Sequence, residues 1–161
     1  MRKSVISEYI KSFIYALIVI ALLYIFLWPV RIVGVSMEPV LNNGNRIFVS
    51  RAMIVAGAYD RNDLVMIRRH DDMGRRYIIK RIIAKPGDSL KIENGQVFVN
   101  SEAVEFGTDS YVAGRISLVL ADNYYFLMGD NHSLSVDSRD FGPLHRNSIR
   151  GRVLFRFMSA S

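Results

Sequence analysis

The sequence contains no cysteine and only three histidines in its 161 residues. Without cysteine the chain can form no disulfide, no thiolate metal site and no thiol nucleophile. The absence of cysteine fits an oxidising compartment without requiring one. Histidine is then the obvious candidate for a catalytic base, and lysine the less obvious one.

The chain also lacks internal repeats, low-complexity tracts and any change in composition that would divide it. Its length predicts a single domain. The formal net charge is +6, but the basic residues are scattered and form no recognised nucleic-acid-binding motif. The scatter argues against a nucleic-acid partner, and the net positive charge favours anionic headgroups or acidic partners.

One long stretch lacks charge altogether. Residues 12–30, SFIYALIVIALLYIFLWPV, are long enough to cross a membrane as a helix. Tyr24, Phe26 and Trp28 near its end suit a headgroup interface. We interpret this stretch as a transmembrane helix; the alternatives are a buried core helix and a cleaved secretory signal ending near Ser36.

The charges on either side of this stretch predict its orientation. Residues 1–11 carry Arg2, Lys3 and Lys11 against Glu8, and short basic tails stay in the cytoplasm. We therefore expect a single-pass protein with a cytoplasmic amino terminus and an extracytoplasmic domain formed by residues 31–161.

Beyond residue 30 the pattern changes to short β-rich runs separated by turn signals, which predicts a mainly β, antiparallel domain. Asn94-Gly95 predicts a two-residue hairpin turn. Residues 101–122 show no clear pattern and read as a loop-rich insertion. The predicted strands are Arg31–Val35, Arg46–Arg51, Asp63–Arg69, Arg76–Ala84, Ser89–Glu93, Gln96–Asn100, Tyr124–Met128 and Arg150–Phe157.

A candidate nucleophile and a candidate base lie in separate segments. Ser36, in GVSMEPVL, follows the apolar stretch by six residues, and a serine nucleophile needs a neighbouring base. In RRYIIKRIIAKPGD, strand alternation places Lys80 between Ile78 and Ile82 on one face. Burial there can lower a lysine pKa to about 5 to 7. The alternative is that Lys80 extends its ammonium to the sheet edge.

The third segment is the polar stretch GDNHSLSVDSRDFGP. Here His132 lies beside Asp130 and Asp137 and is the alternative base, whereas His70 and His145 read as surface residues. A metal site from these three residues is conceivable, but their spacing matches no known ligand pattern. The density of polar groups suits a loop that positions another group, and equally an ordinary polar turn.

Taken together, SMEP, the lysine–arginine strand ending in PGD, and GDN followed by S-x-DSR-x-FGP resemble bacterial type I signal peptidases, in the order found in that family. The resemblance implies a signal-peptidase-like antiparallel β catalytic domain with one N-terminal transmembrane helix in the bacterial cytoplasmic membrane. It also implies that Ser36 is the nucleophile, Lys80 the general base and Ser135 a hydrogen-bond partner of the lysine amine, with no metal or cofactor.

By the same resemblance, Asp137 and Arg139 form a bracing ion pair, and Asp130 and Asn131 shape the loop. The backbone N–H of Ser36 contributes to the oxyanion hole. Some members carry a hydroxyl residue two positions before the nucleophile, where this chain has Gly34, so the second oxyanion hydrogen bond is unassigned.

The resemblance also predicts the partners. These are preprotein signal peptides with small residues at the first and third positions before the cut, the lipid bilayer and, as a candidate, the protein-export machinery. The residues expected to line the substrate pockets are Met37, Leu41, Ile79 and Met128.

Three other functions share parts of this pattern. They are a dedicated pilin or conjugation maturation peptidase, a LexA-like self-cleaving protein and a catalytically silent membrane-bound assembly factor. The apolar stretch argues against the second, and the presence of both Ser36 and Lys80 argues against the third.

Overall fold

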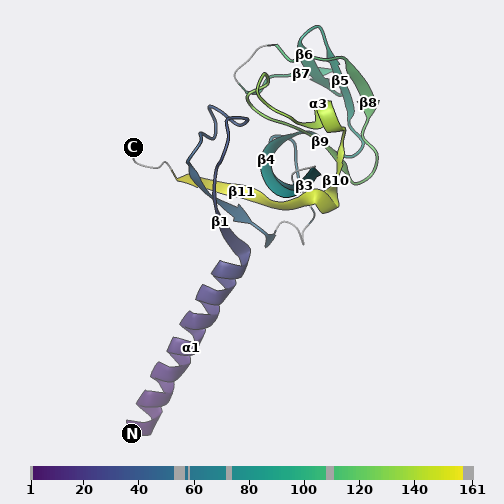
Figure 1. Cartoon of the computed structure of the whole chain (residues 1–161). Coiled ribbons are helices and arrows are strands. Elements are labelled where there is room, and N and C mark those ends of the chain that lie inside the picture. The colour runs from purple at the N-terminus through teal and green to yellow at the C-terminus, as the bar shows by residue number, and fades with distance from the viewer. Residues whose placement is uncertain (1, 53–56, 58, 72–73, 108–110, 158–161) are drawn as a thin grey trace.

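The computed structural model describes residues 2–52, 57, 59–71, 74–107 and 111–157 (Figure 1). The side chains at 2–5, 22–25, 70–71, 75 and 155–157 lie outside the described part. One long helix leads into two antiparallel sheets, which confirms the predicted mainly β, antiparallel class.

The helix α1 (Arg2–Phe26) projects away from the sheets as a single rod (Figure 1). Its large apolar side chains are exposed along the described length, for example Phe13 at 65% and Ile20 at 62%. Among the described residues, no helix combines the length and the apolar character needed to cross a membrane.

The predicted helix boundary at Val30 is wrong, because α1 ends at Phe26 and β1 (Leu27–Arg31) follows directly. The β1 strand pairs with β2 (Arg46–Ser50), which satisfies its backbone polar groups. Pro29 lacks the N–H that a helix interior needs, and Trp28 and Val30 pack against the domain core. The strand expected at Arg31–Val35 is accordingly displaced toward the amino terminus.

The larger sheet has seven strands in the order β1-β2-β11-β3-β4-β9-β10. The second sheet has four strands in the order β7-β6-β5-β8. The remaining strands are β3 (Leu64–Asp71), β4 (Gly74–Ala84), β5 (Ser89–Glu93), β6 (Gln96–Val99), β7 (Glu102–Val104), β8 (Ile116–Val119), β9 (Tyr124–Met128), β10 (Leu144–His145) and β11 (Ile149–Phe157).

Seven of the eight predicted strands are confirmed within two residues at each end, and the hairpin turn is confirmed as well. Asn94 and Gly95 both have positive φ, as a primed turn requires, and they join β5 to β6. The expected loop-rich insertion contains two short strands, β7 and β8, which pair with β6 and β5. Both strands are short and none of their residues is buried, so the local hydrophobic pattern did not reveal them.

Two free sheet edges meet beside the site described below. The β1 strand ends the seven-strand order, and β9 pairs with β4 only from Arg81 to Ala84. The first half of β4 therefore has no neighbour on that side among the described strands. Trp28 of β1 contacts Tyr77 of β4 edge to face, with ring centroids 5.4 Å apart, so the two edges face each other.

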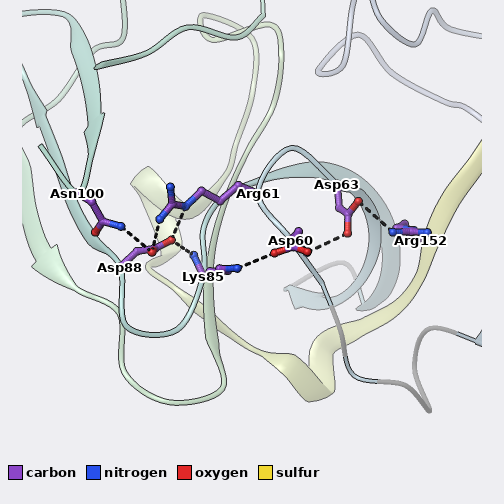
Figure 2. A network of polar contacts seen from close by, with 7 residues as sticks. All are labelled: Asp60, Arg61, Asp63, Lys85, Asp88, Asn100 and Arg152. Carbon is purple, nitrogen blue, oxygen red and sulfur yellow. Dashed lines mark hydrogen bonds and ion pairs between the residues drawn. The ribbon is translucent and has the colours of Figure 1, made fainter. Parts of the chain in front are cut away.

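A polar network ties the turn after β4 to the loop before β3 (Figure 2). The guanidinium of Arg61 binds the buried carboxylate of Asp88, with Nε 2.8 Å from Oδ2. The backbone N–H of Lys85 and the side-chain amide of Asn100 donate hydrogen bonds to the same carboxylate. Burial alone would raise the pKa of Asp88, but these hydrogen bonds hold that pKa below its usual value. The network fixes the second sheet relative to the strand that carries Lys80.

Candidate active site

Lys80 lies on β4 with its side chain directed into the interior. Only 2% of the residue is exposed, so the alternative in which its ammonium reaches solvent at the sheet edge is wrong. Its Nζ donates a hydrogen bond to Ser135 Oγ at 2.7 Å. Desolvation lowers the pKa of Lys80 to about 8, although the nearby charge of Asp137 opposes the change.

A pKa of about 8 changes what this amine can do. At pH 7 about one Lys80 in ten is neutral, compared with about one in 2,500 for a free lysine. A neutral amine can accept a proton from a hydroxyl group. Lys80 therefore has the properties of a general base at neutral pH.

Ser36 lies on the segment after β1, and the loop after β9 holds it through the backbone. Its carbonyl oxygen accepts a hydrogen bond from Asn131 N–H at 3.1 Å. A Cβ atom at Gly129 would collide with both the Ser36 carbonyl oxygen and the Ser135 hydroxyl. Glycine at 129 thus lets the segments of Ser36 and Ser135 approach each other, and the sequence reading missed its role.

Asp137 and Arg139 brace the loop that carries Ser135. The guanidinium of Arg139 binds the Asp137 carboxylate through Nε at 2.9 Å and Nη2 at 3.0 Å, and Nη2 also donates to the His132 carbonyl at 2.8 Å. Asp137 caps the short helix α3 (Ser138–Phe141) and accepts a hydrogen bond from Gly129 N–H.

Burial alone would raise the pKa of Asp137, but these donors and the Ser135 hydroxyl hold that pKa below its usual range. The carboxylate therefore stays ionised at neutral pH. It places a fixed negative charge near the amine of Lys80.

Asp130 is fully buried and is held by Arg81, the residue after Lys80. The guanidinium binds both carboxylate oxygens at 2.7 Å, and its third nitrogen donates to the Asn62 carbonyl at 3.0 Å. The sequence reading named Asp130 but not this partner. The pair joins the strand of Lys80 to the loop of Ser135.

His132 occupies a different environment. Its buried ring packs edge to face against Phe106, at 4.7 Å between centroids, whereas Lys80 is the residue hydrogen-bonded to Ser135. Asp130 and Asp137 each form an ion pair with an arginine. Within the described residues, no group of three possible metal ligands forms. His145 accepts a hydrogen bond from Asn147 N–H. The side chain of His70 lies outside the described residues.

A pocket of about 80 Å³ opens beside Ser36, between the segment after β1 and the free edge of β4. Its lining includes Met37 and Ile79, two of the residues expected to contact substrate. Leu41 and Met128 are instead buried in the core, at 2% and 0% exposure. The lining consists of Val30, Arg31, Ile32, Val33, Gly34, Ser36, Met37, Tyr77, Ile78 and Ile79.

Comparisons with known proteins agree with this geometry. Residues 6–158 match the model of the family described as signal peptidase, peptidase S26. The chain is 32% identical to Signal peptidase I S of Bacillus subtilis (strain 168), over 97% of this chain and 91% of that protein. It is 28% identical to Signal peptidase I of Bacillus licheniformis, over 97% and 90%.

A crystal structure of a signal peptidase I from Enterococcus faecalis V583 has a similar fold. The TM-score is 0.50 and the identity 20%, covering 61% of this chain and 97% of that one. The family match spans nearly the whole sequence and includes every residue of the site. The chain therefore belongs to the signal peptidase family, peptidase S26, and is a serine-type endopeptidase.

Proposed function

We propose that this chain is a membrane-anchored Ser/Lys endopeptidase that removes signal peptides from exported preproteins. The observation that carries the proposal is the buried amine of Lys80, which is hydrogen-bonded to Ser135 on the loop that holds Ser36. Burial lowers the pKa of Lys80 to about 8, as a general base near neutral pH requires.

In the proposed reaction, neutral Lys80 accepts the proton of Ser36 Oγ as that oxygen attacks the scissile carbonyl carbon. The backbone N–H of Ser36 donates to the developing oxyanion. The resulting ammonium of Lys80 returns the proton to the leaving amine, which leaves an acyl-enzyme. Lys80 then takes a proton from a water molecule as the water oxygen attacks the acyl carbon. The bond from that carbon to Ser36 Oγ breaks, the Lys80 ammonium returns the proton to Oγ, and the signal peptide leaves with a free carboxyl end.

The substrate is proposed to lie extended between the free edges of β1 and β4, pairing with their backbones as an added strand. The pocket beside Ser36 is small, which suits the small side chains proposed at the first and third positions before the cut. Met37 and Ile79 line it. Leu41 packs in the same core cluster as these two and is proposed to support the pocket wall from behind. Met128 packs in the cluster of the second sheet, so it is not proposed to contact the substrate in this pocket.

The proposed anchor is the uncharged part of α1, residues 12–26, with the amino terminus in the cytoplasm and the catalytic domain, which begins with β1, outside the bacterial cytoplasmic membrane. The described side chains of α1 include many exposed apolar residues. The side chains of residues 22–25 are not among those described. Val33 and Leu134, near the site, are also exposed apolar residues. This placement would hold the nucleophile where signal peptides emerge, with the protein-export machinery as a candidate partner.

The test is cleavage of a preprotein with an Ala-x-Ala site by the detergent-solubilised full chain, with products identified by mass spectrometry. Wild type is expected to cut after the second alanine. Ser36→Ala is expected to lose at least about 10³-fold in rate, because the acyl-enzyme cannot form. Ser133→Ala, an exposed serine of the loop that carries Ser135, is the matched control and should retain activity. Undiminished cleavage by Ser36→Ala would contradict the proposal.

Asn43 is proposed to position the nucleophile segment. Its Oδ1 accepts a hydrogen bond from Gly34 N–H at 3.2 Å, two residues before Ser36. Asn43→Ala is expected to lower kcat about fivefold, the typical contribution of one hydrogen bond, with little change in KM. Asn43→Asp keeps an acceptor oxygen and should retain the wild-type kcat, as should the neighbouring control Asn42→Ala. An equal loss in Asn43→Asp would assign the effect to the amide donor instead.

A further inference from the structure

A second pocket, of about 360 Å³, lies away from Ser36 and is rich in arginine. Its residues come from the loop before β3, from β3 itself, from the short helix η1 (Arg146–Ser148) and from the start of β11. We call it the arginine pocket. It is lined by Tyr59, Arg68, Arg146, Asn147, Ile149 and Arg150.

Two buried polar atoms in the arginine pocket have no hydrogen-bond partner. Tyr59 is only 5% exposed, and its hydroxyl group bonds to nothing in the described structure. The Nε of Arg150 is buried and likewise without a partner. Tyr59 cannot easily turn away, because its ring packs edge to face on Tyr125 at 6.0 Å. Buried polar groups are nearly always satisfied, so these atoms point to a ligand.

The charge of the pocket indicates what kind of ligand it takes. Within the described part of the chain, no ion pair joins Arg68, Arg146 or Arg150 to a carboxylate. The acidic group that acts on Tyr59 is Asp63, and its carboxylate is already held by Arg152 at 3.4 Å and by a backbone N–H at 3.0 Å. Three unpaired guanidinium groups around one cavity favour an anion, and their planar fork matches phosphate oxygens.

The strand register places the pocket at the end of the sheet from which α1 departs. Leu27, the first residue after α1, pairs with Ser50, which pairs with Arg152, which pairs with Val65. Arg150 and Arg68 lie beyond this row, on the side that points away from Arg31, the far end of β1. Figure 1 shows β11 crossing the lower end of the domain above the top of α1, with its start beside β10.

We propose that Arg68, Arg146, Arg150 and Tyr59 bind a phosphate group, supplied by the headgroup of an anionic phospholipid. The arginines neutralise the phosphate, and the Tyr59 hydroxyl donates a hydrogen bond to one of its oxygens. The cavity is larger than a phosphate ion alone and leaves room for the headgroup. The choice of a lipid over a free phosphate rests on the membrane anchor of the proposed function, since α1 would bring this end of the domain to the bilayer surface.

The test is a binding titration of the full chain in non-ionic detergent, followed by native mass spectrometry. The probes are short-chain phosphatidylglycerol, short-chain phosphatidylcholine and inorganic phosphate. Phosphatidylglycerol is expected to bind most tightly. Arg146→Gln and Arg150→Gln should each weaken that binding about tenfold and Tyr59→Phe about fivefold. Arg115→Gln, an exposed arginine elsewhere, is the control and should bind as wild type does.

The outcomes separate this site from the catalytic proposal. Ser36→Ala should bind the lipid normally, and the arginine-pocket variants should cleave a short soluble peptide normally. Equal weakening by Arg115→Gln, or no weakening by the pocket variants, would overturn the site. Inorganic phosphate binding as tightly as phosphatidylglycerol, with the same sensitivity to the variants, would overturn the lipid assignment and leave a soluble phosphate ligand. A separate flotation experiment with phospholipid vesicles tests the anchor. If wild type does not float with the vesicles, the anchor is rejected, whatever the binding titration in detergent gives.

Discussion

The rate of peptide cleavage is expected to rise with pH and to level off above about pH 8, and Lys80→Met is expected to abolish it. The reacting form of Lys80 is the neutral amine, whose pKa burial lowers to about 8. Below that pH most of the enzyme carries an ammonium that cannot accept the Ser36 proton. Loss of a positioned general base lowers rates by about 10²- to 10⁴-fold.

The measurement is kcat/KM for a peptide substrate between pH 6 and pH 10, for wild type and two variants. Lys91→Met is the matched control, because Lys91 is an exposed lysine of β5. Its profile should coincide with that of wild type. A midpoint near 6.5, or activity retained in Lys80→Met, would instead move the role of base to His132.

The same substitution is expected to stabilise the folded protein at pH 7. The pKa of Lys80 is about 8 when folded and 10.5 in its ordinary state, so the unfolded chain holds more protons between these values. The free energy of unfolding therefore rises with pH through this window. Below pH 8 the folded protein bears the full cost of burying the charged ammonium of Lys80. Lys80→Met removes this cost, a gain of roughly 3 kcal/mol. Thermal unfolding should show a higher Tm for Lys80→Met at pH 7 and a smaller difference near pH 10.5.

The burial of Lys80 was predictable from sequence because its cause is local. A strand alternates its faces, so Lys80 was expected on the face of Ile78 and Ile82, and only the position of its ammonium was left open. The Asn94-Gly95 turn was predictable for a similar reason, since a two-residue primed turn requires positive φ at both positions. In both cases the deciding interaction lies within a few residues of the chain.

Features that depend on distant partners were missed. The end of α1 is set by pairing with β2, about twenty residues away, and β8 forms by pairing with β5, about 25 residues earlier in the chain. Gly129 matters only because the segments of Ser36 and Ser135 converge there. Helix propensity and hydropathy read along the chain contain none of this information.

Arg81 is the clearest example of a residue whose role depends on a partner far away in the sequence. In the sequence it stands out only as the arginine that follows Lys80, and its partner Asp130 lies 49 residues away. Neither residue alone signals the pairing, because Arg81 sits in an apolar strand and Asp130 in a polar loop. Once paired, they join the two segments that supply Lys80 and Ser135.

Arg81→Met is therefore expected to lower the free energy of unfolding by about 3–5 kcal/mol, because it leaves the carboxylate of Asp130 buried and unpaired. The loss is a large part of the stability of a typical domain. Denaturant unfolding of the full chain in detergent measures it. Lys85→Met, which removes the exposed bridge to Asp60, is the control and should leave the unfolding midpoint nearly unchanged.

The double variant Arg81→Met/Asp130→Asn separates the lost pair from the stranded charge. If the buried charge causes the loss, the double variant should be more stable than Arg81→Met alone, because a neutral amide replaces the carboxylate. Its activity should still fall, since nothing then ties the strand of Lys80 to the loop of Ser135. A double variant as unstable as Arg81→Met would show that the missing arginine itself, through its contact with the Asn62 carbonyl, holds this part of the fold together.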